Sequence, residues 1–168
     1  MSQFKVGWYL IYTKPHHEKK VYTRLLERNI NAFLPLTKRL RSWNDRKKYI
    51  DEPLFPSYVF IYLNDMQNFY EGIDAEGTLY YVKMGNSIAR VNESVVNNLR
   101  IVTGKVTDLE VSENRFQNGR KLVISQGALT GLSCEVVNYD KKEKILVRVD
   151  LLRRNILLSL PEDHLLSA

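Results

Sequence analysis

The sequence has little sulfur and little imidazole: its 168 residues include one cysteine, Cys134, and three histidines. A single cysteine excludes an internal disulfide, and no secretory apolar segment follows Met1, so a reducing, intracellular compartment is favoured. No apolar run approaches the roughly 18–20 residues that a membrane-spanning helix requires. We therefore expect a cytoplasmic protein that does not bind membranes.

The sequence also lacks the motifs of the common enzyme classes. It has no Gly-x-Ser-x-Gly, no P-loop and no Gly-x-Gly-x-x-Gly. His17 is not followed by a second histidine at the spacing of a helical zinc site. Cys134 lies in an apolar β-type segment without a basic neighbour in sequence, which favours a buried thiol over a nucleophile. We therefore expect no enzyme activity, no metal and no cofactor.

Positive charge is concentrated at one end of the chain. The net charge is +6. Residues 1–48 carry twelve Lys/Arg against three Asp/Glu, whereas residues 49–106 have a net charge of −3 and residues 107–168 a net charge of zero. A basic block of this kind either binds a polyanion through its phosphates or forms a solvated face, and charge alone does not choose between the two.

Over the first 106 residues, β-type and helical patterns alternate. Strands are expected at 6–13, 30–36, 57–63 and 78–84, and helices at 16–29, 64–74 and 92–104. Residues 37–48 predict a hairpin or loop with Asn44 and Asp45 at its tip. This mixture predicts an α+β domain over residues 1–106.

The pattern changes after residue 106. Residues 107–118 are polar with little periodicity and predict a linker. Short β-type segments follow at 121–125, 132–139, 144–151 and 154–160. Their spacing of about 8–12 residues predicts a small all-β barrel over 119–168. The leucine-rich stretch 151–166 leaves a helical alternative open.

The strand in "FPSYVFIYL" is apolar on both faces. Tyr58, Phe60 and Tyr62 share one face, and aliphatic residues occupy the other. The first strand repeats this pattern, with Trp8 and Tyr12 on one side. The aromatic side is either a second core layer or an exposed patch, which on a soluble protein usually marks a partner site.

Three stretches carry a resemblance to a known family: "WYLIYTKPHHEKKVYTRLLERNINAFLP", "EPLFPSYVFIYL" and "YYVKMG". Together they resemble the N-terminal (NGN) domain of the NusG family of transcription elongation factors. The tail "NGRKLVISQGALTGLSCEVVNYDKKEKILVRVDLLRRNILLSL" resembles the KOW domain of that family, a small five-stranded barrel. "EPLFPSYVF" and "QGALTGL" look closest to the specialised paralogues of the RfaH and UpxY types.

The resemblance implies an antiparallel sheet flanked by helices, joined by a linker to the KOW barrel. It also implies that an apolar sheet face binds the clamp helices of the largest RNA polymerase subunit. The positions that match this contact are Tyr12, Leu54, Phe55, Pro56, Phe60 and Tyr81. A second contact, to the polymerase gate loop, maps near Phe69 and Tyr70.

A factor of this type suppresses pausing and termination. A specialised paralogue would act on selected operons, and the alternative within the family is a general elongation factor. An alternative from another class is a KOW-type RNA-binding or ribosome-associated protein, against which the zero net charge of residues 107–168 argues.

Specialised paralogues also contact the displaced non-template DNA strand. Lys14, His17 and Lys20 match the DNA-facing helix edge of the family, and Arg24 adds charge beside it. A second basic and aromatic cluster in the predicted hairpin suits duplex DNA or RNA phosphate, with a solvated loop as the alternative. This cluster comprises Arg39, Arg41, Trp43, Arg46 and Lys47.

The tail departs from the usual KOW signature at two glycine positions, occupied here by Cys134 and Arg153, while Gly127 and Gly131 are retained. KOW domains of this family recruit a ribosomal small-subunit protein or the termination factor Rho. The two substitutions put Rho binding in doubt and favour a specialised paralogue.

Overall fold

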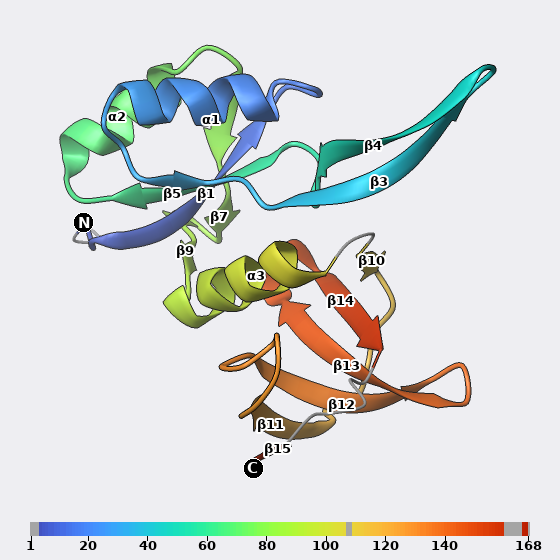
Figure 1. Cartoon of the computed structure of the whole chain (residues 1–168). Helices are drawn as coiled ribbons and strands as arrows, with labels where there is room; N and C mark the ends of the chain where they lie inside the picture. Colours follow the sequence, from blue (N-terminus) through green and yellow to red (C-terminus); the bar gives the residue numbers. More distant parts are fainter. Residues whose placement is uncertain (1–3, 107–108, 160–165, 168) are drawn as a thin grey trace. The chain divides into compact units, whose positions relative to one another are not determined.

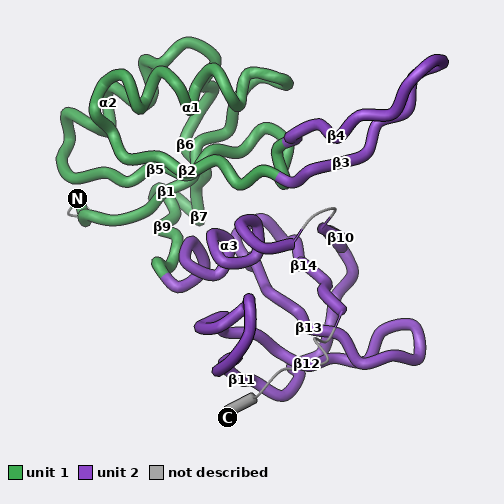
Figure 2. Tube along the Cα trace, in the orientation of Figure 1, with its two compact units in different colours: residues 1–36, 53–93 green, residues 37–52, 94–168 purple. Residues whose placement is uncertain are grey.

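The computed structural model describes residues 4–106, 109–159 and 166–167. The chain divides into two compact units (Figure 2). Unit 1 comprises residues 1–36 and 53–93, and unit 2 comprises residues 37–52 and 94–168. These units do not coincide with the boundaries at 106 and 119 that the sequence suggests. No helix in the described ranges is long and apolar enough to cross a membrane.

Unit 1 is an antiparallel sheet with the order β2-β5-β1-β6, and β9 also pairs with β1. Helices α1 and α2 cover one face of this sheet (Figure 1). The strands are β1 (Gly7–Thr13), β2 (Ala32–Phe33), β5 (Tyr58–Leu63), β6 (Thr78–Tyr81) and β9 (Arg90–Val91). The helices are α1 (Glu18–Glu27) and α2 (Met66–Asp74). The remaining pair is β7 (Lys83–Met84) with β8 (Ser87–Ile88).

The core of unit 1 lies between the sheet and these two helices. Central strands β1 and β5 pair with Leu10 opposite Phe60. Their helix-facing side chains are aliphatic apart from Tyr9, and they pack against Val21 and Leu25 of α1. The strand residues on this side are Tyr9, Ile11, Val59, Ile61 and Leu63.

Capping and turn residues define the ends of several elements of unit 1. The side chain of Asp65 caps α2 by accepting from the Asn68 N–H at 2.8 Å. Helix α1 ends before Asn29, which takes a positive φ of 59°. Gly85 also has a positive φ, of 64°, in the turn between β7 and β8. Asn and Gly accept this backbone conformation at low cost.

Unit 2 contains helix α3 (Glu93–Lys105), except for its first residue, and a six-stranded antiparallel sheet with the order β10-β14-β13-β12-β11-β15. It also contains most of a two-stranded hairpin, β3 (Leu36–Trp43) and β4 (Arg46–Pro53), which confirms the predicted tip at Asn44 and Asp45. The sheet strands are β10 (Glu110–Ser112), β11 (Arg120–Ile124), β12 (Ser133–Tyr139), β13 (Lys142–Val149), β14 (Arg154–Ser159) and β15 (Leu166–Ser167).

The expected linker is partly structured. Residues 110–112 form β10, in which Val111 pairs with Ile156 of β14. The preceding Leu109 is 1% exposed. The alternation of Leu109 and Val111 with polar residues is a short strand signal within an otherwise polar stretch. Residues 107–108 lie outside the described part.

The described residues within 151–166 do not form the helix that the sequence left open as an alternative. Only 150–152 form a helical turn, of the 3-10 type, and 154–159 form strand β14 between β10 and β13. Residues 160–165, including His164, lie outside the described ranges. The predicted strand at 30–36 is likewise reduced to β2, and Leu36 already belongs to the hairpin.

The side chain of Asn98 connects helix α3 to the sheet of unit 2. The Asn98 amide donates to the Ser133 carbonyl at 3.1 Å and accepts from the Ser133 N–H at 3.1 Å. This two-way bond joins the helix to the first residue of β12.

Candidate functional site

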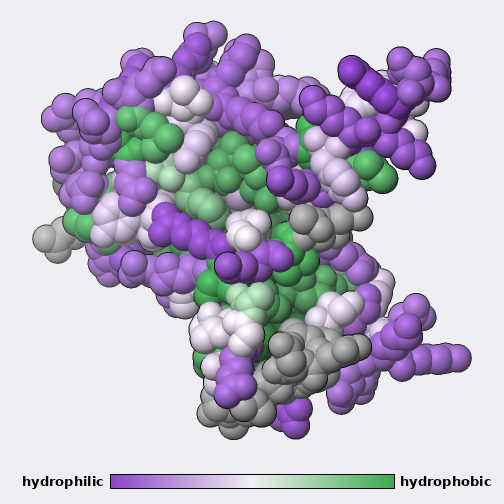
Figure 3. Space-filling model, in the orientation of Figure 1, coloured by the Kyte–Doolittle hydropathy of each residue, from purple (hydrophilic) through white to green (hydrophobic). Residues whose placement is uncertain are grey.

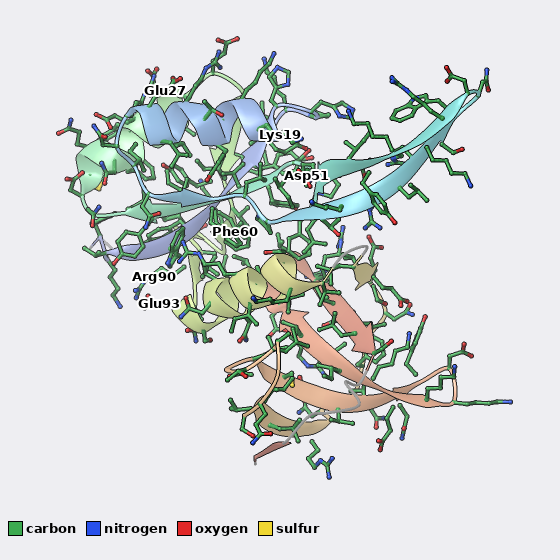
Figure 4. All side chains as sticks on the ribbon, viewed as in Figure 1. Lys19, Glu27, Asp51, Phe60, Arg90 and Glu93 are labelled. Atoms are coloured by element: carbon green, nitrogen blue, oxygen red, sulfur yellow. The ribbon has the colours of Figure 1, made fainter. Side chains whose placement is uncertain are left out.

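The face of the unit 1 sheet opposite α1 and α2 carries a row of rings, here called the aromatic face. The rings of Trp8 and Tyr62 lie 5.3 Å apart, as do those of Tyr12 and Tyr58. Tyr12 also stacks on Tyr80 of β6 at 5.0 Å. Phe60, labelled in Figure 4, lies on the side of the sheet away from α1. The face comprises Trp8, Leu10, Tyr12, Phe33, Tyr58, Phe60, Tyr62 and Tyr80.

The centre of the aromatic face is buried and its edge is exposed. Leu10 and Phe60 have no exposed surface, whereas Tyr80 is 51% exposed. Within the sheet, β5 lies between β2 and β1, so Phe60 is flanked laterally by the Phe33 ring at 5.9 Å and by Leu10. Of the two alternatives for the aromatic side, the buried centre has the character of a core layer, and exposed Tyr80 has the character of an exposed patch.

The turn before β5 holds the other residues expected to contact the clamp helices. Leu54 and Phe55 are each 3% exposed, while Pro56 is exposed. The Leu54 N–H donates to the Pro35 carbonyl at 2.8 Å, which ties this segment to the chain before the hairpin. Of these three residues, Pro56 is the one with an exposed side chain.

A buried carboxylate fixes the conformation of this turn. Ser57 has a positive φ of 71°, and its N–H donates to the Glu18 carboxylate at 2.8 Å. The Ser57 carbonyl accepts from the Thr13 N–H at 2.8 Å. Glu18 is 5% exposed, so this backbone N–H satisfies a carboxylate that would be costly to bury alone. The first turn of α1 thus positions the start of β5.

Tyr81 lies on the opposite face of the sheet from Phe60, so the structure does not bring the two together. Tyr81 pairs with Ile11, stacks on Phe69 at 4.6 Å and donates its hydroxyl to the Phe69 carbonyl. Burial raises the pKa of this hydroxyl. Its neighbour Tyr80 occupies the aromatic face instead, because successive strand residues point to opposite sides.

The two residues expected to contact the polymerase gate loop, Phe69 and Tyr70, differ in exposure. Phe69 packs against the helix-side core. Tyr70 is 62% exposed and meets the Phe69 ring edge-on at 5.4 Å. Met66 and Ile73, at helical spacing from Tyr70, are 42% and 37% exposed. Helix α2 therefore presents an exposed apolar stripe that sequence inspection identified only in part.

The basic edge of α1 is partly neutralised. Lys14 and Lys20 are exposed, and His17 precedes α1 with Nδ1 3.0 Å from the Pro15 carbonyl. Arg24 donates to the Glu76 carbonyl at 2.7 Å and forms an ion pair with the Glu76 carboxylate at 2.8 Å. Its charge is therefore less available to a phosphate than the charges of the two lysines.

The hairpin arginines are also engaged. Arg41 donates to Glu52 at 2.6 Å, and Arg39 lies 3.6 Å from the same carboxylate. The Arg46 guanidinium lies over the Trp43 ring, 5.6 Å from its centroid. In the view of Figure 3, hydrophilic residues dominate the outer end of the hairpin.

Lys47 does not lie with this group, because it is one residue away from Arg46 along β4 and points to the other side of the ribbon. The sequence predicts a single cluster of Arg39, Arg41, Trp43, Arg46 and Lys47. The structure separates them into two faces, and it adds exposed Leu40 and Tyr49, which the sequence reading did not single out.

At the two positions where the KOW resemblance predicts glycine, Cys134 and Arg153, the backbone conformations differ. Cys134 is buried in β12, as expected, and burial followed by the charge of Glu135 raises its pKa to about 11. Arg153 has a positive φ of 52°, the conformation that glycine adopts most readily. In the described residues no group of three or more His, Cys, Asp and Glu side chains could hold a metal ion.

One family model and several solved structures are similar to this chain. A family model described as "Transcription termination factor nusG" matches residues 7–108. A solved structure on domain interaction in Thermotoga maritima NusG shares 17% identity, covering 92% of this chain and 94% of that chain, with a TM-score of 0.48. Conformation A of the MjSpt4:Spt5 complex shares 11% identity, covering 95% and 91%, with a TM-score of 0.33. Because the family model covers more than half of the chain, this protein belongs to the NusG family of transcription factors.

Proposed function

We propose that this protein is a specialised elongation and antitermination factor. It binds the clamp helices of RNA polymerase through its aromatic face and suppresses pausing and termination on selected operons. The observation that carries the proposal is the aromatic face itself, because a sheet whose helices cover one side has a continuous row of rings on the other. A helix pair docks on such a surface through a few aromatic and aliphatic anchors.

The anchors divide into a rim and a centre. Tyr12, Tyr80 and exposed Pro56 form an accessible rim, and Phe60 with Leu10 forms the centre. A partner that reaches the centre must bind a state in which Phe60 is accessible. The apparent affinity is then the intrinsic affinity multiplied by the fraction of molecules in which Phe60 is accessible.

The action we propose is mechanical and involves no covalent step. A protein bound to the clamp biases polymerase toward the elongating state only if it binds that state more tightly than the paused one. A second contact with the gate loop would strengthen this bias. The exposed stripe of Met66, Tyr70 and Ile73 on α2 supports such a contact, with Phe69 packed behind Tyr70.

Nucleic-acid contacts would provide selectivity for particular operons. Lys14, His17 and Lys20 form the edge that we assign to the displaced non-template DNA strand, and Arg24 contributes less because of its pairing with Glu76. We assign residues 119–168 to a KOW domain with a ribosomal small-subunit protein as partner. Rho binding is disfavoured by Cys134 and Arg153.

A reconstituted elongation assay tests the proposal. Tyr12→Ala should lose pause suppression and bind a clamp-helix fragment at least tenfold more weakly, since interface tyrosines are frequent hot spots. Tyr22→Ala is the matched control, because Tyr22 is also a half-buried tyrosine of unit 1 but packs on the opposite, helix-side core.

Two results would contradict the proposal: no effect of the wild type on pause lifetime, or equal losses for the two variants. Templates with and without a candidate leader distinguish a specialised factor from a general one. A general factor would suppress pausing equally on both.

A further inference from the structure

The hairpin β3–β4 has two chemically different faces. Its strands end at Trp43 and Arg46 around a two-residue turn, and counting outward from this turn places Leu40 opposite Tyr49. Alternation along each strand then sorts the side chains. The arginine face carries the side chains of Arg39, Arg41, Trp43, Arg46, Lys48 and Glu52. The tyrosine face comprises Lys38, Leu40, Lys47, Tyr49 and Asp51.

Apart from exposed Lys48, the arginines and the tryptophan of the arginine face are occupied by internal contacts. Glu52 binds both Arg39 and Arg41, and Arg39 also donates to the Leu109 carbonyl at 3.2 Å. Arg46 lies over the Trp43 ring. An incoming phosphate or base would have to displace these contacts before it could bind.

The tyrosine face is open. Tyr49 is 61% exposed and Leu40 is 50% exposed. Lys38 and Lys47 are exposed on either side of them. Asp51 lies toward the base of the hairpin, so the charge beside Tyr49 on the tip side is the positive charge of Lys47. Each strand has eight residues, which corresponds to a ribbon of roughly 25 Å at about 3.3 Å per residue.

Building on the proposed function, we propose that the tyrosine face binds single-stranded nucleic acid. An unpaired base stacks on the Tyr49 ring beside Leu40, and the ammonium groups of Lys38 and Lys47 contact the flanking phosphates. An accessible aromatic ring next to cations is the combination with which proteins hold single strands. Base-paired nucleic acid offers no free base face for this ring, so duplexes gain only the phosphate contacts.

The experiment uses the full chain and a fluorescein-labelled 12-nucleotide strand, as DNA, as RNA and as a duplex. Tyr49→Ala should weaken single-strand binding by about 5- to 100-fold, the range for loss of one stacked base. Tyr49→Phe should restore it. Lys47→Gln should reduce the slope of log affinity against log salt by about 0.7 for a single strand. Lys48→Gln, the same charge change on the other face, should leave the single-strand affinity unchanged.

The inference is overturned if Tyr49→Ala binds like the wild type, or if Lys48→Gln loses as much affinity as Lys47→Gln. It is also overturned if Tyr49→Ala weakens duplex binding as much as it weakens single-strand binding. The DNA and RNA arms identify which strand is preferred. Thermal melting of each variant shows whether the fold is kept. Clamp-helix binding of the same variants reports separately on the proposed function, whose failure would leave the oligonucleotide result standing.

Discussion

At the scale of single residues, Arg153 has a backbone conformation that glycine adopts most readily. Its φ of 52° lies in the left-handed region, directly after the helical turn of residues 150–152. A side chain in this conformation costs about 1–2 kcal/mol. The observed backbone explains how the chain tolerates arginine here: the turn keeps its shape and the strain is local.

Glu135 is a carboxylate whose pKa links the stability of the fold to pH. Burial alone would raise its pKa, but hydrogen bonds from the Arg148 side chain and the Gly119 N–H, together with the charge of Arg148, hold the pKa below its ordinary value. A carboxyl group with a lowered pKa stabilises the fold above its unfolded-state pKa, and this contribution is lost as the pH falls through the folded-state value.

We therefore expect Glu135→Gln to flatten the acid limb of the stability curve. Thermal melting of wild type and variant between pH 7 and about pH 3 measures this, with the window set by the ordinary glutamate pKa of about 4.3 and the lower folded value. The wild type should lose more stability than the variant on acidification. Parallel curves would show that this carboxylate does not contribute.

At the scale of elements, the sheet of unit 1 illustrates the effect of strand parity. Both faces of β1 and β5 are apolar, so sequence periodicity alone does not assign a side to the core. Helix packing shows which face belongs to the core, because the apolar side of α1 packs on the aliphatic face. The same parity places Tyr80, and not Tyr81, with Phe60.

The attachment of α3 to β12 depends on Asn98. We expect Asn98→Ala to reduce the free energy of unfolding by about 1–3 kcal/mol, because it removes both bonds to the Ser133 backbone. Hydrogen exchange at the Ser133 amide should accelerate in the variant. The control is Asn97→Ala, an exposed neighbour on the same helix, which should leave that amide protected.

At the scale of the whole molecule, the lone thiol reports on opening of the chain. Cys134 is the only cysteine, and its pKa is raised to about 11 from an ordinary value of 9.0. At pH 8 the thiolate fraction is then about 100-fold lower than for an ordinary thiol, and only the thiolate reacts. Labelling with a thiol reagent should be at least this much slower in native than in unfolded protein. Equal rates would show that the site is open.

In the proposed function, different surfaces of the protein bind polymerase and nucleic acid. The aromatic face and the stripe on α2 would hold polymerase, and the basic edge and the tyrosine face of the hairpin would hold nucleic acid. Such a protein requires no catalytic group, which is consistent with membership in a family of transcription factors.

Local sequence alone was sufficient for the features that depend on nearby residues. The two-faced strand ending in Leu63, the cap at Asp65 and the hairpin tip at Asn44 and Asp45 are set by periodicity and turn chemistry within a few positions. The family itself was also recognisable, because its motifs are short and continuous.

Only the tertiary structure decided which of these side chains lie together. The separation of Tyr81 from Phe60, the neutralisation of Arg41 by Glu52 and the pairing of β10 with β14 all depend on strand register. Register joins residues that are far apart in sequence or on facing strands, and a shift of one position reverses every side chain. Local periodicity does not contain that information, so composition could identify the basic and aromatic residues but not their faces.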